Sequence, residues 1–219
     1  MRRVAVKGGT WRLVPTRHPP VQTFETVASP EDLEAVMELE GWTNDRLVRQ
    51  RLARLPRERW VHGRANASVV MAAFLHASPA GARFSGPDLG AWYCALGELT
   101  AIAEVGHHLR QEVRRARLPS LAVQYRGYVA HLAGRYHDLR GAGATHAELY
   151  DPGSWAASQR FGEALRAAGA DGLVYDSVRH VSGTCIAAYD PRQVLQVTVG
   201  ASFELTVPEQ GRIVARRLS

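Results

Sequence analysis

An arginine, a tyrosine and a glutamate follow one another in residues 81–105, and these side chains are the best placed in the sequence to do chemistry. Arg83 precedes a predicted strand that carries Tyr93, and a predicted helix then presents Glu104. The neighbours of Glu104 in TAIAEVG are small or apolar. A carboxylate in such a setting needs a partner or a chemical role. Two interpretations follow: an ion pair with a nearby arginine at the helix edge, or a carboxylate that acts on a substrate.

A second polar motif lies in residues 171–191, where Ser177 follows a predicted strand and precedes Arg179. In the first motif, the separations from arginine to tyrosine and from tyrosine to glutamate are 10 and 11 residues. The order and spacing of the two motifs resemble those of the RES-domain family, bacterial toxins that consume NAD. The resemblance extends roughly from residue 11 to residue 199. A shift in the alignment of the second motif would replace Ser177 with Ser182.

The resemblance implies a fold similar to that of ADP-ribosyltransferases, in which a split β-sheet core clasps NAD and buries its nicotinamide end. Glu104 would stabilise the cation that forms on the ribose, or hold a ribose hydroxyl and orient the acceptor. Arg83 and Arg179 would bind the diphosphate through paired hydrogen bonds. Tyr93 would stack on the nicotinamide ring, and Ser177 would hold the carboxamide or a ribose hydroxyl. These residue types suit the reaction, because cleavage between nicotinamide and ribose passes through an oxocarbenium-like state that a carboxylate stabilises.

By the same resemblance, the chain would be the toxin component of a bacterial type II toxin–antitoxin pair. NAD would be its substrate, with no prosthetic group, since neither GxGxxG nor GxxxxGK[ST] occurs in the sequence. The sequence leaves open whether ADP-ribose is transferred to a protein side chain, to water or to phosphate. The expected partners are an antitoxin with a helix-turn-helix domain, a protein acceptor of ADP-ribose and a second copy of the chain, as a homodimer within the antitoxin complex.

Histidine residues offer two further candidates for a functional site, one at the substrate cleft and one for binding a metal. His62 could border the substrate cleft or make only local hydrogen bonds. Glu104 with His107 and His108 forms a Glu-x-x-His pattern that can place two metal ligands on one helix face. Because HExxH and a second such pattern are missing, we expect no metal. The surroundings of Ser177 also lack the GxSxG motif of serine hydrolases.

Composition supports an alternative without catalysis. The formal net charge is +6 and the pI is near 9.8, mostly from arginine, which favours polyanionic partners. The chain could therefore be a non-catalytic basic module that binds nucleic acid or an acidic protein, although this leaves Glu104 unexplained. An enzyme that acts on another nucleotide, such as an RNA end, is a further alternative. No apolar run approaches the ~18 residues of a membrane span, and the start MRRVAVKGGTW lacks the apolar core of a secretory signal. A cytoplasmic protein with no membrane attachment is therefore expected.

An α+β fold must position these motifs. Apolar periodicity and helix end signals predict helices at residues 29–41, 44–56, 98–117 and 158–170. Runs rich in β-branched and aromatic residues predict strands within residues 69–74, 91–96, 121–128, 172–178, 184–190 and 194–200. We expect one domain over residues 1–219, a split sheet with flanking helices, and residues 1–60 as a helical N-terminal elaboration. Cys94 and Cys185 lie in apolar runs, so no disulfide is expected.

Overall fold

The computed structural model describes residues 1–17, 24–39 and 46–218. Within these ranges the fold is mixed α+β, with a nine-stranded sheet and five α-helices, which confirms the predicted class. The strands, in their order across the sheet, are β1 (Arg3–Val4), β5 (Tyr136–Asp138), β6 (Gly172–Asp176), β7 (Thr184–Ala188), β3 (Trp92–Ala95), β2 (Thr10–Pro15), β4 (Ser120–Leu132), β8 (Val194–Pro208) and β9 (Val214–Leu218). The pair β5–β6 is parallel and the other neighbours are antiparallel.

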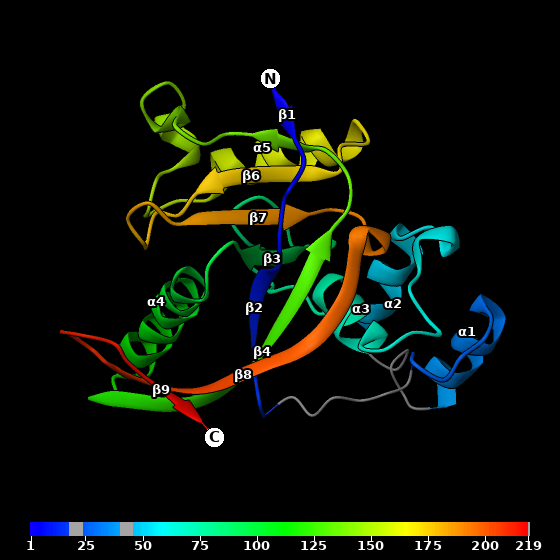
Figure 1. The fold of residues 1–219 in the computed structure, drawn as a ribbon, viewed down its shortest axis with the longest axis horizontal. Helices are drawn as coiled ribbons and strands as arrows, with labels where there is room; N and C mark the ends of the chain where they lie inside the picture. The colour runs from blue at the N-terminus through cyan, green and yellow to red at the C-terminus, as the bar shows by residue number, and fades with distance from the viewer. Residues whose placement is uncertain (18–23, 40–45, 219) are drawn as a thin grey trace.

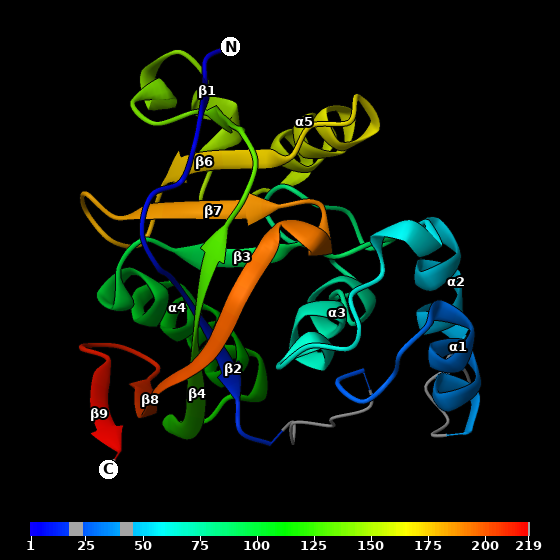
Figure 2. The ribbon, with the colours of Figure 1, turned by 45° about the vertical axis from the view of Figure 1, so that its right-hand side comes forward.

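The sheet is weakest where β3 meets β2. These strands share a single pair of Cα partners, Trp11 and Ala95, whereas β2 pairs with β4 along its whole length. Figures 1 and 2 show the reason: β6, β7 and β3 run across the view, and β2, β4 and β8 run steeply down it. Two groups of strands with different directions therefore meet at one point.

Helices cover both faces of this sheet. Helix α4 (Glu98–Ala116) contacts β2, β3, β4, β7 and β8, and α3 (Ala67–Leu75) packs against β3. In β3 the side chains alternate, so that Trp92 and Cys94 join the cluster of buried residues that includes α3, and Ala95 joins the cluster that includes α4. Helices α1 (Pro30–Leu39) and α2 (Arg46–Arg54) lie on the α3 side, and α5 (Ala156–Ala167) contacts β6 (Figure 1).

The predicted helices at 98–117 and 158–170 are confirmed as α4 and α5, and those at 29–41 and 44–56 contain α1 and α2. Their predicted boundaries at residues 40–45 lie outside the described residues. Five of the six predicted strands are confirmed: those beginning at residues 91, 172 and 184 contain β3, β6 and β7, the one at 121–128 covers the middle of β4, and the one at 194–200 covers the start of β8. Both cysteines are free and buried.

One predicted strand is wrong, because residues 69–74 belong to helix α3. An apolar run of this length has no periodicity that separates a strand from a helix buried on most sides, and seven of the nine residues of α3 are buried. The helical description of residues 1–60 was also incomplete, since β1 and β2 lie in this part of the chain and β2 is in the interior of the sheet. No helix in the described ranges is long and apolar enough to cross a bilayer.

Arg51 on α2 ties the helical section to the rest of the fold. Its side chain is buried and donates hydrogen bonds to the main-chain carbonyls of Leu75, Ala77 and Pro87 at 2.8, 2.8 and 3.1 Å. We expect Arg51→Met to lower the free energy of unfolding by about 2–3 kcal/mol, because one buried and two partly buried carbonyls lose a charged donor. Urea denaturation measures this change. Arg49→Met, on an exposed position of the same helix, is the control, and equal stability of the two variants would contradict the prediction.

Candidate active site

A cavity of about 260 Å³ opens where β2 and β3 diverge. Four of the residues predicted from sequence line it together: Arg83, Tyr93, Glu104 and Arg179. The rest of the lining comes from β2, β3, α4 and the segments around them: Trp11, Arg12, Leu13, Ala82, Cys94, Ala95, Ala101, Val105, His107, His108, Trp155, Tyr175 and Cys185. Residues far apart in the sequence therefore form one concave site at the junction of the sheet.

Glu104 projects from α4 into this cavity. Its Oε1 accepts a hydrogen bond from the Ser177 hydroxyl at 2.6 Å and lies 3.5 Å from Sγ of Cys185. Within the described part of the chain, Glu104 takes part in no ion pair. The interpretation of Glu104 as half of a surface ion pair with arginine is therefore not supported by the geometry, and its negative charge faces the cavity without a bonded cation.

Ser177 links Glu104 to the loop after β6. Its Oγ accepts hydrogen bonds from the main-chain N–H groups of Arg179 and His180 at 3.1 and 3.0 Å, so its single hydroxyl hydrogen is directed to Glu104. Ser177, like Ser182, is absent from the cavity lining, and it is placed to orient the carboxylate of Glu104 rather than to reach a ligand itself. Ser182, the alternative from sequence, lies in the following turn with φ +60° and an exposed side chain, and it does not line the cavity.

Two arginine side chains, those of Arg83 and Arg179, line the cavity. Arg83 is 7% exposed and donates to the carbonyls of Leu149 and Asp151 at 3.1 and 3.0 Å. Arg179 donates to the carbonyl of Pro152 at 3.2 Å. Burial, and then the nearby charge of Arg83, lower the pKa of Arg179. Neither guanidinium is paired with a carboxylate among the described residues, so the pair offers uncompensated positive charge to an anion.

Tyr93 lines the cavity from β3, but its hydroxyl is already engaged. The oxygen accepts a hydrogen bond from the main-chain N–H of Phe84 at 3.1 Å and lies 3.0 Å from the hydroxyl of Ser85. Burial raises the pKa of Tyr93, so the phenol remains protonated. The ring is therefore the part of Tyr93 available to a ligand, while the hydroxyl fixes the segment that follows Arg83.

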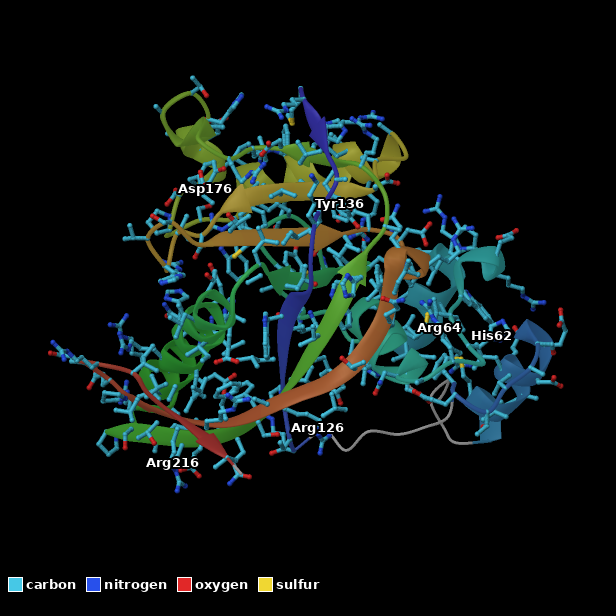
Figure 3. All side chains as sticks on the ribbon, in the orientation of Figure 1. His62, Arg64, Arg126, Tyr136, Asp176 and Arg216 are labelled. Atoms are coloured by element: carbon cyan, nitrogen blue, oxygen red, sulfur yellow. The ribbon has the colours of Figure 1, made fainter. Side chains whose placement is uncertain are left out.

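His62 lies outside the cavity. Its Nδ1 is 3.3 Å from the carbonyl of Val27, it is absent from the cavity lining, and Figure 3 shows it beside the helices of the α3 side. The structure thus gives His62 a local hydrogen bond and no place at the cleft. In the described ranges no cluster of three or more His, Cys, Asp or Glu side chains is arranged to bind a metal.

Sequence reasoning missed Arg12 and Trp155. Arg12 lies on β2, a strand that was not predicted, and Trp155 directly precedes α5 in a loop. No motif distinguishes either residue, because the chain is rich in arginine and a single tryptophan before a helix is more often a packing residue. Only the fold brings them to the cavity lined by Glu104.

The fold and the cavity define an α+β protein with a concave site that combines one carboxylate with several arginines. The sequence matches the RES domain over residues 51–208, and the chain belongs to the RES-domain family. It is also 29% identical over 195 residues to the uncharacterized protein y4oC of Sinorhizobium fredii (strain NBRC 101917 / NGR234), covering 85% of this chain and 77% of that protein. A crystal structure of the M. tuberculosis MbcT–MbcA toxin–antitoxin complex is similar to 56% of this chain and 73% of its own, with 19% identity and a TM-score of 0.40.

The histidines at the cavity make stability depend on pH. Burial, together with the charges of Arg179 and other neighbours, lowers the pKa of His107 from 6.5 to about 4. The unfolded chain therefore binds a proton at His107 between pH 6.5 and 4 that the folded chain does not bind, so stability falls as the pH falls through this window. We expect His107→Gln to flatten the decline, as measured by urea denaturation at pH 4.5 and 7. An unchanged decline would contradict this assignment.

Proposed function

We propose that this protein is the toxin of a bacterial type II toxin–antitoxin pair and that it cleaves the bond between nicotinamide and ribose in NAD. Membership of the RES-domain family supports the class of protein. The observation that carries the reaction is the charge of Glu104, which is held by Ser177 in the same cavity as Arg83 and Arg179. None of these three charged groups has an ion-pair partner among the described residues. A site with this distribution of charge suits a substrate that is anionic in the middle and becomes cationic at one ribose.

In this proposal the carboxylate of Glu104 lies beside the ribose that carries nicotinamide. The C–N bond breaks, its electron pair leaves with nicotinamide as a neutral molecule, and Glu104 stabilises the positive charge that develops on the ribose. Arg83 and Arg179 hold the diphosphate, and the ring of Tyr93 stacks on nicotinamide. The acceptor then attacks the ribose carbon and loses a proton. Water, phosphate and a protein side chain give a glycohydrolase, a phosphorylase and an ADP-ribosyltransferase, respectively.

We also infer an ADP-ribosyltransferase-like split sheet. The single pair of Cα partners between β2 and β3, with a cavity beside it, supports this inference. The remaining proposals follow from family membership: a cytoplasmic protein, an antitoxin partner with a helix-turn-helix domain, a homodimer within the antitoxin complex, and a protein acceptor if ADP-ribose is transferred.

Glu104→Gln should reduce the release of nicotinamide from NAD by at least about 100-fold, because a neutral amide cannot stabilise the developing cation. The assay uses NAD with a labelled adenylate, with and without cell lysate and phosphate. Label on a lysate protein identifies a transferase, and small labelled products identify a glycohydrolase or a phosphorylase. Glu112→Gln, an exposed carboxylate further along α4, is the matched control.

If folded wild-type protein without antitoxin releases no nicotinamide, the enzymatic proposal is wrong and a basic binding module becomes the better explanation. A Glu104→Gln variant as active as the wild type would remove Glu104 from the reaction while leaving NAD as the substrate.

Ser177→Ala should lower kcat by about tenfold with little change in KM, because Glu104 loses the donor that orients it but keeps its charge. Steady-state kinetics of nicotinamide release measure the two constants. Ser182→Ala tests the shifted alignment of the second motif: a larger loss of kcat in that variant would contradict the role given to Ser177.

A further inference from the structure

The cavity is too small to enclose a whole dinucleotide. Cavities that bury most of a drug-sized ligand measure about 300–1,000 Å³, and this one measures about 260 Å³. NAD is larger than such a ligand, so part of it must lie at the open end of the cavity. Where this part of NAD binds is inferred from the residues at the open end, and the inference rests on the proposed function.

Burial distinguishes the two ends of the cavity. Ala95 and Cys185 at the inner end are 2% and 3% exposed, and Arg83 is 7% exposed. His108 is exposed and Trp155 is partly exposed, and both line the same cavity. We call the end formed by His108 and Trp155 the mouth. The Oε1 of Glu104 lies 3.5 Å from Sγ of the buried Cys185, so the ribose that reacts lies at the inner end and the adenosine end is directed to the mouth.

The mouth presents two aromatic rings in contact. The centroids of His108 and Trp155 are 5.9 Å apart, and their planes meet at 72°. Partial desolvation of the imidazole ring at the cavity lowers the pKa of His108, and the charges of Arg179 and Arg83 lower it further against the opposing effect of Glu104. The imidazole is therefore neutral at neutral pH. An edge-to-face pair is a favourable arrangement of two rings, and Trp155 keeps part of its surface exposed at the mouth.

Trp155 is held in place before any ligand binds. Its carbonyl accepts hydrogen bonds from the N–H of Gln159 at 2.7 Å and from the hydroxyl of Ser158 at 3.1 Å. The segment that leads to Trp155 is fixed by Arg83 and Arg179 through the carbonyls of residues 149, 151 and 152. Arg83 and Arg179, which would bind the diphosphate, therefore also help to position Trp155, because they hold the segment that precedes it.

We propose that Trp155, supported by His108, forms the subsite for the adenine ring of NAD and is a residue that determines specificity for the dinucleotide. Aromatic side chains bind bases by stacking on their faces. The order along the site is then Glu104 at the reacting ribose, the two arginines at the diphosphate, and Trp155 at the adenine. Nicotinamide mononucleotide has the reacting bond but no adenosine, so it would not reach Trp155.

The first test compares NAD with nicotinamide mononucleotide as substrates for the wild type, Trp155→Ala and Trp155→Phe. We expect Trp155→Ala to raise KM for NAD about tenfold, with kcat nearly unchanged and KM for the mononucleotide unchanged. Trp155→Phe retains an aromatic face and should recover most of the loss. An equal rise of KM for both substrates, or no rise for NAD, would overturn the proposal. Urea denaturation of each variant checks that the fold is kept.

The second test measures binding without turnover. Calorimetry with ADP-ribose and with ribose 5-phosphate should show that Trp155→Ala weakens binding of ADP-ribose about tenfold and leaves ribose 5-phosphate unaffected. Equal affinity of wild type and variant for ADP-ribose would overturn the subsite even if NAD is consumed. Loss of ADP-ribose binding in the variant, together with a wild type that does not consume NAD, would support the subsite and contradict the proposed reaction.

Discussion

The site depends on the short pairing between strands β2 and β3, which share a single pair of Cα partners. Where neighbouring strands pair fully, their side chains and main-chain hydrogen bonds leave no room for a ligand. Here only Trp11 and Ala95 are paired, and the side chain of Arg12 donates to the carbonyl of Tyr93 at 2.9 Å in place of a further main-chain bond. The guanidinium of Arg12 also lies over the ring of Trp92, 5.0 Å from the ring centroid. A side chain thus holds the two groups of strands together while allowing them to diverge around the cavity.

Arginine side chains also donate to main-chain carbonyls elsewhere in the fold, so part of the basic composition has a structural explanation. Arg51, Arg64 and Arg166 donate to main-chain carbonyls at a helix end, a strand end and a loop, respectively. Such carbonyls would otherwise be left without donors inside the protein. Part of the net charge of +6 therefore reflects internal hydrogen bonding. A polyanionic partner is not needed to explain these residues, which weakens the argument for a basic binding module.

The sequence predicted the features that repeat locally and missed those that depend on the whole fold. The order and spacing of Arg83, Tyr93 and Glu104 resemble those of the RES-domain family, and the cavity lining brings these three side chains together. The run at residues 69–74 was assigned to a strand because a buried helix has no polar face to reveal its period. The short strand β2 carries no local signal, since its partners are distant in the sequence, such as Ala95 for Trp11. The loop residue Trp155 reaches the cavity only because the fold brings it to His108 on α4.

In the part of the chain that the structure describes, the charged groups of the site are bonded to dipoles and not to opposite charges. Glu104 accepts from a hydroxyl, while Arg83 and Arg179 donate to carbonyls. An arginine bonded to Glu104 would neutralise the charge that a cationic transition state needs, and a carboxylate bonded to either arginine would compete with a diphosphate. Neutral partners fix the directions of these groups without cancelling their charge. Because the partners belong to the fold, little reorganisation is required when a substrate binds, which is the condition under which electrostatic stabilisation is most effective.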